Sequence, residues 1–206
     1  MNTDKNFSRK DFFNNMAVIW DDKYLNPKLL SFLEEFVPLF GIKRGEKVLD
    51  VGTGTGVLIP FLLKSVGSSG SITAVDYAEN MIEICRKKHS HIPNLTIIVQ
   101  DVEKMDFNPE SFDTVTCFGL LPHLNNINDA LRNFYNVLKP DGKLIIAHAL
   151  SSEEIKEHHM KSESVYGDDL PEEQEMITLL NKVGFKEETI RDEPGLYLCK
   201  SKKIRQ

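Results

Sequence analysis

The chain has 206 residues, of which 41% are hydrophobic and 27% charged, and its formal net charge is −6 at pH 7. This composition supplies a packed core and excludes a disordered chain. The negative charge argues against nucleic acid as the main partner, because phosphate binding needs a basic face. The length predicts one domain, residues 1–206.

Apolar runs and cysteines bear on location. No apolar run approaches the roughly 20 residues that cross a membrane, and the N-terminus lacks the apolar segment of a signal peptide. Cys85, Cys117 and Cys199 are far apart and lack C-x-x-C spacing, so they indicate reduced core residues. We therefore expect a cytoplasmic protein without membrane insertion.

The first 150 residues predict helices followed by alternating strands and helices. Residues 7–22 and 26–40 have the pattern of two helices, broken before Pro27. From residue 46 onward, apolar periodicity predicts strands at 47–51, 70–76, 94–101, 112–119 and 143–150, and helices at 56–66, 78–90 and 127–138. The residues "KPDG" at 139–142 predict a turn. Such alternation favours a parallel sheet covered on both faces.

The last segment differs in pattern. Residues 151–169 predict a polar helix and then a loop. The following helix, 170–185, has Pro171 at its start and Gly184 at its end. Two short strands, 186–192 and 195–202, are predicted to form a hairpin.

Three glycines at alternate positions, Gly52, Gly54 and Gly56, follow the first strand in "VLDVGTGTGVL". Glycine permits a sharp bend and the close approach of a ligand. The dinucleotide fingerprint G-x-G-x-x-G needs glycine where this chain has Val57, and no Lys follows as in a P-loop. A pyrophosphate turn is therefore disfavoured, whereas a merely tight connection remains possible.

Acidic residues end three successive strands. Asp50, Asp76 and Asp101 fall at the edge where open α/β sheets bind ligands. Each alone could be a helix cap or a turn residue, but the three in order indicate a ligand site. The ligand that fits these acids has a ribose, an amino-bearing base and a cationic amine, and no phosphate.

These segments resemble the motifs of the class I S-adenosylmethionine-dependent methyltransferases. The resemblance covers residues 40–150 and rests on "VLDVGTGTGVL", "ITAVDYAENMI", "VQDVEKMDF", "FDTVTCFGLLPHL" and "LKPDGKLIIA". The upstream "FFNNMAVIWDD" resembles the N-terminal cap helix of the ubiquinone- and menaquinone-biosynthesis subgroup. The resemblance implies an α/β, Rossmann-like, doubly wound sheet of seven strands, mostly parallel with the last antiparallel. It also implies cap helices at 1–40, a cofactor-binding core at 41–150 and a substrate side at 151–206.

By the same resemblance, S-adenosyl-L-methionine is the cofactor. Residues implied around its methionine part are Asp50, Gly52, Thr53, Gly54 and Thr55. Those implied at the ribose and adenine are Asp76, Tyr77, Met81, Asp101 and Val102. Phe118 and Gly119 would lie beside the amino acid and the reactive methyl group. One departure is Pro122 in "GLLPHL", which puts the role of His123 in doubt.

Candidate groups for the methyl acceptor are fewer and less specific. His148, at the end of the fifth strand, and His123 are the catalytic candidates, because an acceptor that carries a proton needs a base. Candidate substrate residues are Trp20, Tyr24, His158, His159 and Tyr166. A histidine bonded to a nearby loop, or exposed to solvent, is the simpler interpretation. A base or metal cluster of His148, His158 and His159 is a hypothesis without recognised ligand spacing, and no metal is expected.

The acceptor itself is not specified. No "DPPW" or "NPPY" run follows the fourth strand, which together with the acidic charge favours a small molecule over nucleic acid or protein. The expected assembly is a monomer or homodimer. Two alternatives remain: a non-catalytic protein that binds S-adenosylmethionine or S-adenosylhomocysteine as a regulator, and a polyamine transferase. The latter is disfavoured because "CFGLLPHL" has no acid to hold a polyamine.

Overall fold

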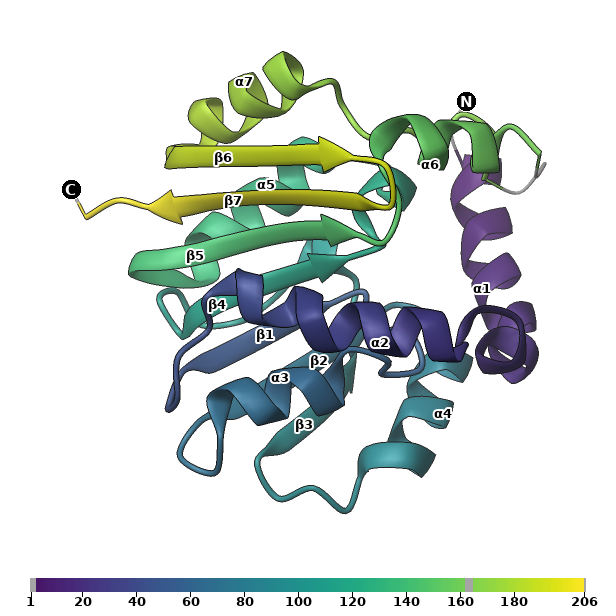
Figure 1. Ribbon diagram of the computed structural model, residues 1–206, viewed down its shortest axis with the longest axis horizontal. Coiled ribbons are helices and arrows are strands. Elements are labelled where there is room, and N and C mark those ends of the chain that lie inside the picture. Colours follow the sequence, from purple (N-terminus) through teal and green to yellow (C-terminus); the bar gives the residue numbers. More distant parts are fainter. Residues whose placement is uncertain (1–2, 162–164, 206) are drawn as a thin grey trace. The chain divides into compact units, whose positions relative to one another are not determined.

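The computed structural model describes residues 3–161 and 165–205 (Figure 1). Residues 162–164, in the loop expected after the polar helix, lie outside the described residues. The chain divides into two compact units, Met1–Val102 and Glu103–Gln206. The organisation of residues 1–206 as one domain, with its three subdivisions, stays a prediction.

The first unit consists of helices and three parallel strands. In chain order it contains α1 (Thr3–Tyr24), α2 (Pro27–Phe36), the 3-10 helix η1 (Val37–Phe40), β1 (Lys47–Val51), α3 (Ile59–Val66), β2 (Ser71–Asp76), α4 (Glu79–His89) and β3 (Leu95–Val99). The strands lie in the order β3-β2-β1. The predicted break before Pro27 is confirmed. Asn26 caps α2 there, because its side chain accepts a hydrogen bond from the backbone N–H of Leu29 at 2.9 Å.

Apolar residues of β1 and β2 form part of the buried core of the first unit. Val48, Leu49 and Val51 of β1 are fully buried, as are Ala74 and Val75 of β2. Helices α3 and α4 contact these strands, and α1 contacts α4. The carboxyl ends of β1 and β2 lie next to each other, since Val51 pairs with Val75. The loops that follow the two strands are therefore neighbours.

The second unit contains four strands. Its elements are β4 (Phe112–Phe118), η3 (Leu121–His123), α5 (Ile127–Val137), β5 (Leu138–His148), α6 (Ser152–His159), α7 (Glu173–Val183), β6 (Phe185–Glu193) and β7 (Leu196–Lys203), and η2 (Val102–Lys104) precedes them. The strand order is β4-β5-β7-β6. Strands β4 and β5 are parallel, whereas β7 is antiparallel to both of its neighbours.

Two predicted boundaries are wrong in the second unit. The helix expected from residue 170, with Pro171 at its start, begins at Glu173. Residues 139–142, expected as a turn, belong to β5. The local irregularity is still visible, because Asp141 has a φ of 63° and the pairing with β4 shifts between Phe112 and Thr114. The end of α7 is as predicted: Gly184 caps it in the left-handed conformation, with a φ of 116°.

The predicted fold class is confirmed. The seven strands form a mostly parallel sheet whose last strand in the chain is antiparallel, with helices packed against it. Among the residues that the structure describes, no helix has the length and apolar character needed to cross a membrane.

Candidate functional site

The glycine turn after β1 uses its three glycines in two different ways. Gly52 and Gly54 have φ angles of 69° and 55°, in the left-handed region that favours glycine. A Cβ atom added to Gly54 would meet nothing within 4 Å, so this part of the turn is open. A Cβ on Gly56 would lie 2.8 Å from Cδ2 of His89 and 2.9 Å from Sγ of Cys85. Gly54 therefore leaves room for a ligand, and Gly56 leaves room for α4.

Asp76, at the end of β2, holds this turn. Its Oδ2 accepts a hydrogen bond from the backbone N–H of Gly54 at 2.9 Å, and its Oδ1 accepts one from Ala78 at 2.9 Å. Burial raises the pKa of Asp76 to about 6, although backbone N–H groups oppose the rise. A carboxylate has about four lone-pair positions, so Asp76 retains acceptor capacity for hydroxyl donors of a ligand.

The two threonines of the turn differ in their partners. Thr55 donates from Oγ1 to Oδ1 of Asp21 in α1 at 2.5 Å. Thr53 is 5% exposed, and within the described part of the chain its buried Oγ1 has no hydrogen-bond partner. A buried hydroxyl without a partner is costly. Thr53 is therefore the better candidate for a ligand contact, and Thr55 has a structural partner.

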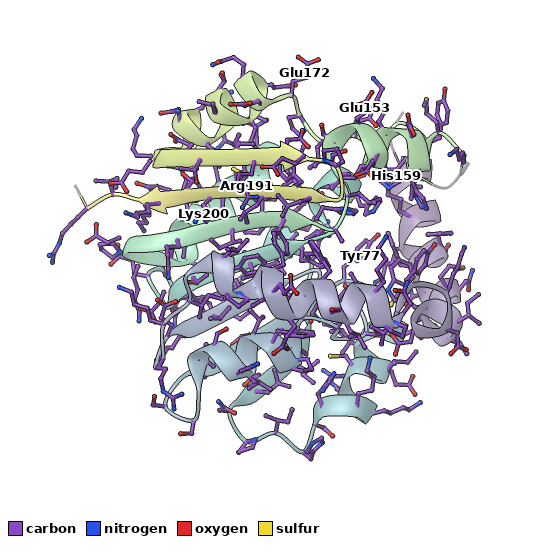
Figure 2. All side chains as sticks on the ribbon, in the orientation of Figure 1. Tyr77, Glu153, His159, Glu172, Arg191 and Lys200 are labelled. Atoms are coloured by element: carbon purple, nitrogen blue, oxygen red, sulfur yellow. The ribbon has the colours of Figure 1, made fainter. Side chains whose placement is uncertain are left out.

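The other predicted cofactor residues of the first unit lie close in the chain to the strand ends. Asp50 is 1% exposed within β1. Asp101 follows β3 and is partly buried, and Val102 begins η2 and is buried. Tyr77 and Met81 pack against α1, and Met81 is 2% exposed (Figure 2 labels Tyr77). The walls of the predicted adenine site thus include α1.

The second unit brings a histidine pair together around a carboxylate. Nδ1 of His123 lies 3.0 Å from Oδ2 of Asp168, and these side chains are 13% and 2% exposed. Nδ1 of His159 contacts the backbone oxygen of Asp168, and the rings of His123 and His159 have centroids 5.0 Å apart. Sequence reasoning missed Asp168, which stands in the polar run "YGDDL" without any periodic signal.

His148 has a different environment. Its Nδ1 accepts a hydrogen bond from the backbone N–H of Leu150 at 3.0 Å, so the neutral ring carries its proton on Nε2. The ring stacks on Phe118 with centroids 6.3 Å apart, and Gly119 adjoins its Nε2 edge. Burial, helped by neighbouring histidines, lowers the pKa of His148 to about 3. This arrangement suits a hydrogen-bond donor better than a base.

The remaining candidates are scattered. His158 is exposed, with its ring centroid 5.8 Å from that of His159, which is buried at the end of α6 (Figure 2 labels His159). Tyr166 is 62% exposed. Trp20 and Tyr24 are neighbours on α1, with ring centroids 4.5 Å apart. Within residues 3–161 and 165–205, no three His, Cys, Asp or Glu side chains are grouped to hold a metal ion, so the metal-cluster hypothesis has no support.

Comparison with known proteins agrees with this architecture. Residues 42–194 match a family model described as a methyltransferase domain. This chain belongs to the methyltransferase domain family. The predicted membership of the class I S-adenosylmethionine-dependent methyltransferases, and the enzyme class and cofactor that go with it, are confirmed at the level of the family.

Individual relatives and solved structures are similar to this methyltransferase over most of its length. It is 34% identical over 146 residues to a demethylmenaquinone methyltransferase of Staphylococcus aureus. The aligned region covers 68% of this chain and 56% of that relative. The match thus spans little more than half the length of the relative. A SAM-dependent methyltransferase from Aquifex aeolicus has the same fold, with a TM-score of 0.74, 24% identity and coverage of 89% of this chain and 96% of that chain. A chain in the complex of the Haloferax volcanii Trm112 methyltransferase activator with a methyltransferase has a TM-score of 0.78 and 17% identity, and the match covers 94% and 98% of the two chains.

The residues of the first unit fit S-adenosylmethionine. The buried Thr53 hydroxyl lacks a hydrogen-bond partner within the described residues, and Gly54 adjoins open space. The Asp76 carboxylate suits ribose hydroxyls, which donate hydrogen bonds. The individual roles of the predicted cofactor and substrate residues stay predictions.

Proposed function

We propose that this methyltransferase transfers a methyl group from S-adenosylmethionine to a small-molecule acceptor whose reacting group carries a proton. Support comes from the family match over residues 42–194 and from relatives named for demethylmenaquinone. Those names favour an acceptor of the quinone type. The net charge of −6 argues against nucleic acid as the acceptor.

The observation that carries the acceptor chemistry is the contact between His123 and Asp168. When His123 donates Nδ1–H to the buried carboxylate at 3.0 Å, its Nε2 holds the ring's lone pair. Asp168 also stabilises the imidazolium that forms if Nε2 takes a proton. His123 is therefore the proposed base and Asp168 its positioning residue. His148, whose Nδ1 accepts from Leu150, is the weaker candidate for a base.

The first unit supplies most of the proposed cofactor contacts. Bound S-adenosylmethionine supplies an electrophilic methyl group on a sulfonium. Asp76 accepts hydrogen bonds from ribose hydroxyls, and Asp101 accepts one from the adenine amine. The Thr53 hydroxyl and the open backbone at Gly54 hold the methionine part. These residues need only bind and align, because in-line displacement gains most from proximity.

The location and assembly belong to the same proposal. Cys85, Cys117 and Cys199 are buried free thiols, which fits a reducing compartment such as the cytoplasm. We keep a monomer or homodimer as the proposed assembly.

The test is methyl transfer by the purified full chain. The protein is incubated with radiolabelled S-adenosylmethionine and a set of small acceptors that includes a short-chain demethylmenaquinol, and labelled product and S-adenosylhomocysteine are quantified. Turnover that falls about 100-fold in His123→Gln supports the proposal. Tight binding of S-adenosylhomocysteine without turnover of any acceptor would favour the regulatory alternative. No binding of either cofactor form contradicts both functions.

A further inference from the structure

One carboxylate of α1 joins the glycine turn to α4. Asp21 accepts a hydrogen bond at Oδ1 from the Thr55 hydroxyl, at 2.5 Å, and at Oδ2 from Nζ of Lys88, at 2.8 Å. Thr55 is 2% exposed, and the Lys88 and Asp21 side chains are 30% and 32% exposed. Asp21 is thus in contact both with a buried residue of the turn and with the last part of α4.

A second attachment lies nearer the start of α1. Oδ1 of Asn14 accepts a hydrogen bond from the backbone N–H of Asn80 at 2.9 Å, and the Asn80 side chain donates to the backbone oxygen of Asn14 at 3.1 Å. Lys10 pairs with Glu79 at 2.5 Å. These contacts fix α1 at the first turn of α4, directly after the corner that follows β2.

Apolar packing covers the stretch between the two attachments. Ala17 is 2% exposed and packs with Ala78 and Met81. Phe13 packs at the edge of this cluster, with its ring centroid 6.3 Å from that of Tyr77 (labelled in Figure 2). The residues expected to flank adenine are therefore held by α1, and the residues expected to hold the methionine part are tied to the same helix by Asp21.

The environment of Asp21 stabilises its ionised form. Burial alone would raise its pKa, but the hydrogen bonds from Lys88 and Thr55 outweigh this and lower the pKa below its ordinary value. Hydrogen bonds that involve an ionised group are stronger than neutral ones. The adjacent Asp22 is exposed, so the chain offers a matched carboxylate outside this contact.

We propose that Asp21 is a positioning residue that fixes the glycine turn against α1, so that docking of α1 and binding of S-adenosylmethionine are coupled. This inference rests on the proposed function, because it concerns the same cofactor. It assigns Thr55 to anchoring the turn, and it leaves the cofactor contact to Thr53. A ligand that binds only the docked arrangement stabilises that arrangement.

The test measures binding of S-adenosylhomocysteine to the full chain by calorimetry. Asp21→Ala should raise the dissociation constant about tenfold, and Asp22→Ala should leave it unchanged. Thr55→Val should weaken binding, and Thr55→Ser, which keeps the hydroxyl, should restore it. The double variant Asp21→Ala/Thr55→Val should bind no more weakly than Asp21→Ala alone, because both changes remove the same contact. Hydrogen exchange of α1 should slow when the ligand is added to the unsubstituted protein.

The outcomes distinguish a failure of the coupling from a failure of the proposed function. If the unsubstituted protein binds the ligand and Asp21→Ala binds it equally well, the coupling is refuted and the proposed function stands, even where α1 exchanges faster. If Asp21→Ala does not fold, the Thr55→Val and Thr55→Ser pair decides the question, and equal affinities refute the coupling. If the unsubstituted protein binds neither S-adenosylhomocysteine nor S-adenosylmethionine, the proposed function fails first and the coupling falls with it.

Discussion

Asp168 and His123 form a nearly buried pair, although 45 positions separate them in the chain: Oδ2 of the carboxylate lies 3.0 Å from Nδ1 of the ring. The Asp168 side chain is 2% exposed, and its own backbone oxygen contacts His159. Such a carboxylate fixes the tautomer of the histidine it faces, so that the basic lone pair of the neutral ring is on Nε2. The pair therefore predicts that substitutions at these two residues affect turnover and cofactor affinity differently.

Replacing either residue should lower turnover without weakening cofactor binding. We expect His123→Gln to lower kcat about 100-fold and Asp168→Ala about tenfold, since a positioned base contributes roughly that much. The affinity for S-adenosylhomocysteine should stay unchanged, because neither residue is among the proposed cofactor contacts. Asp168→Glu should recover part of the turnover. Rates and affinities are measured side by side, with the exposed His91→Gln as the control, and equal kcat in all variants would contradict the role.

Asp76 predicts that cofactor affinity depends on pH. Burial raises its pKa from the ordinary value of 3.8 to about 6. The ionised carboxylate accepts backbone hydrogen bonds at both oxygens and is the stronger acceptor for a ribose hydroxyl, and it becomes protonated as the pH falls through about 6. The dissociation constant of S-adenosylhomocysteine should therefore change little above pH 7 and rise about tenfold between pH 7 and pH 5. Calorimetry across this range tests the expectation. Asp76→Asn should bind more weakly with a flatter profile, and a flat profile in the unsubstituted protein would show that Asp76 does not control binding.

The two glycines Gly54 and Gly56 should fail in different ways when each becomes alanine. At Gly56, a Cβ would lie 2.8 Å from His89 and 2.9 Å from Cys85, at a φ of 88°. Overpacking and backbone strain should together lower the free energy of unfolding by about 2–4 kcal/mol. At Gly54 the Cβ meets nothing within 4 Å at a φ of 55°, so only about 1–2 kcal/mol of strain is expected.

For ligand binding, in contrast to stability, the substitution at Gly54 should have the larger effect. Gly54→Ala places a methyl group in the open part of the turn, so it should weaken binding of S-adenosylhomocysteine more than its loss of stability explains. Urea unfolding gives the stabilities and calorimetry at low temperature gives the affinities. A Gly54→Ala protein with full affinity would show that the ligand does not approach this backbone.

The fold could be predicted because its signals are local. Apolar runs such as residues 47–51, glycines after strands and proline at the start of α2 each restrict the backbone within a few residues. The turn at 139–142 was wrong as a boundary for the opposite reason. Pairs with β4 lie on both sides of it, Phe112 with Leu138 and Thr114 with Lys143, so β5 runs through an irregular stretch instead of starting after a turn, and that pairing is a contact between distant segments.

The site was predictable only in part, for the same physical reason. Asp50, Asp76 and Asp101 lie at or just beyond the ends of recognisable strands, so their edge of the sheet can be inferred. Asp21 and Asp168 each stand beside a second aspartate, in "WDD" and "GDD", and nothing local shows which carboxylate turns inward. Burial and long-range partners select Asp21 and Asp168 over their neighbours. Those selections depend on tertiary packing, which single-sequence patterns do not contain.

His148 should remain neutral where an ordinary histidine is protonated. Its Nδ1 accepts from Leu150 at 3.0 Å, and burial lowers its pKa to about 3. Long-range proton–nitrogen spectra of protein labelled with 15N at histidine should therefore show the Nε2–H tautomer of His148 from pH 7 to pH 5. The assignment comes from the His148→Gln variant, which lacks this signal. The same residue in urea-unfolded protein should titrate near the ordinary value of about 6.5, and that difference isolates the effect of the fold. Protonation of His148 in the folded protein above pH 5, or an Nδ1–H tautomer, would contradict the donor role. Either result would make His148 a competitor of His123 for the role of base.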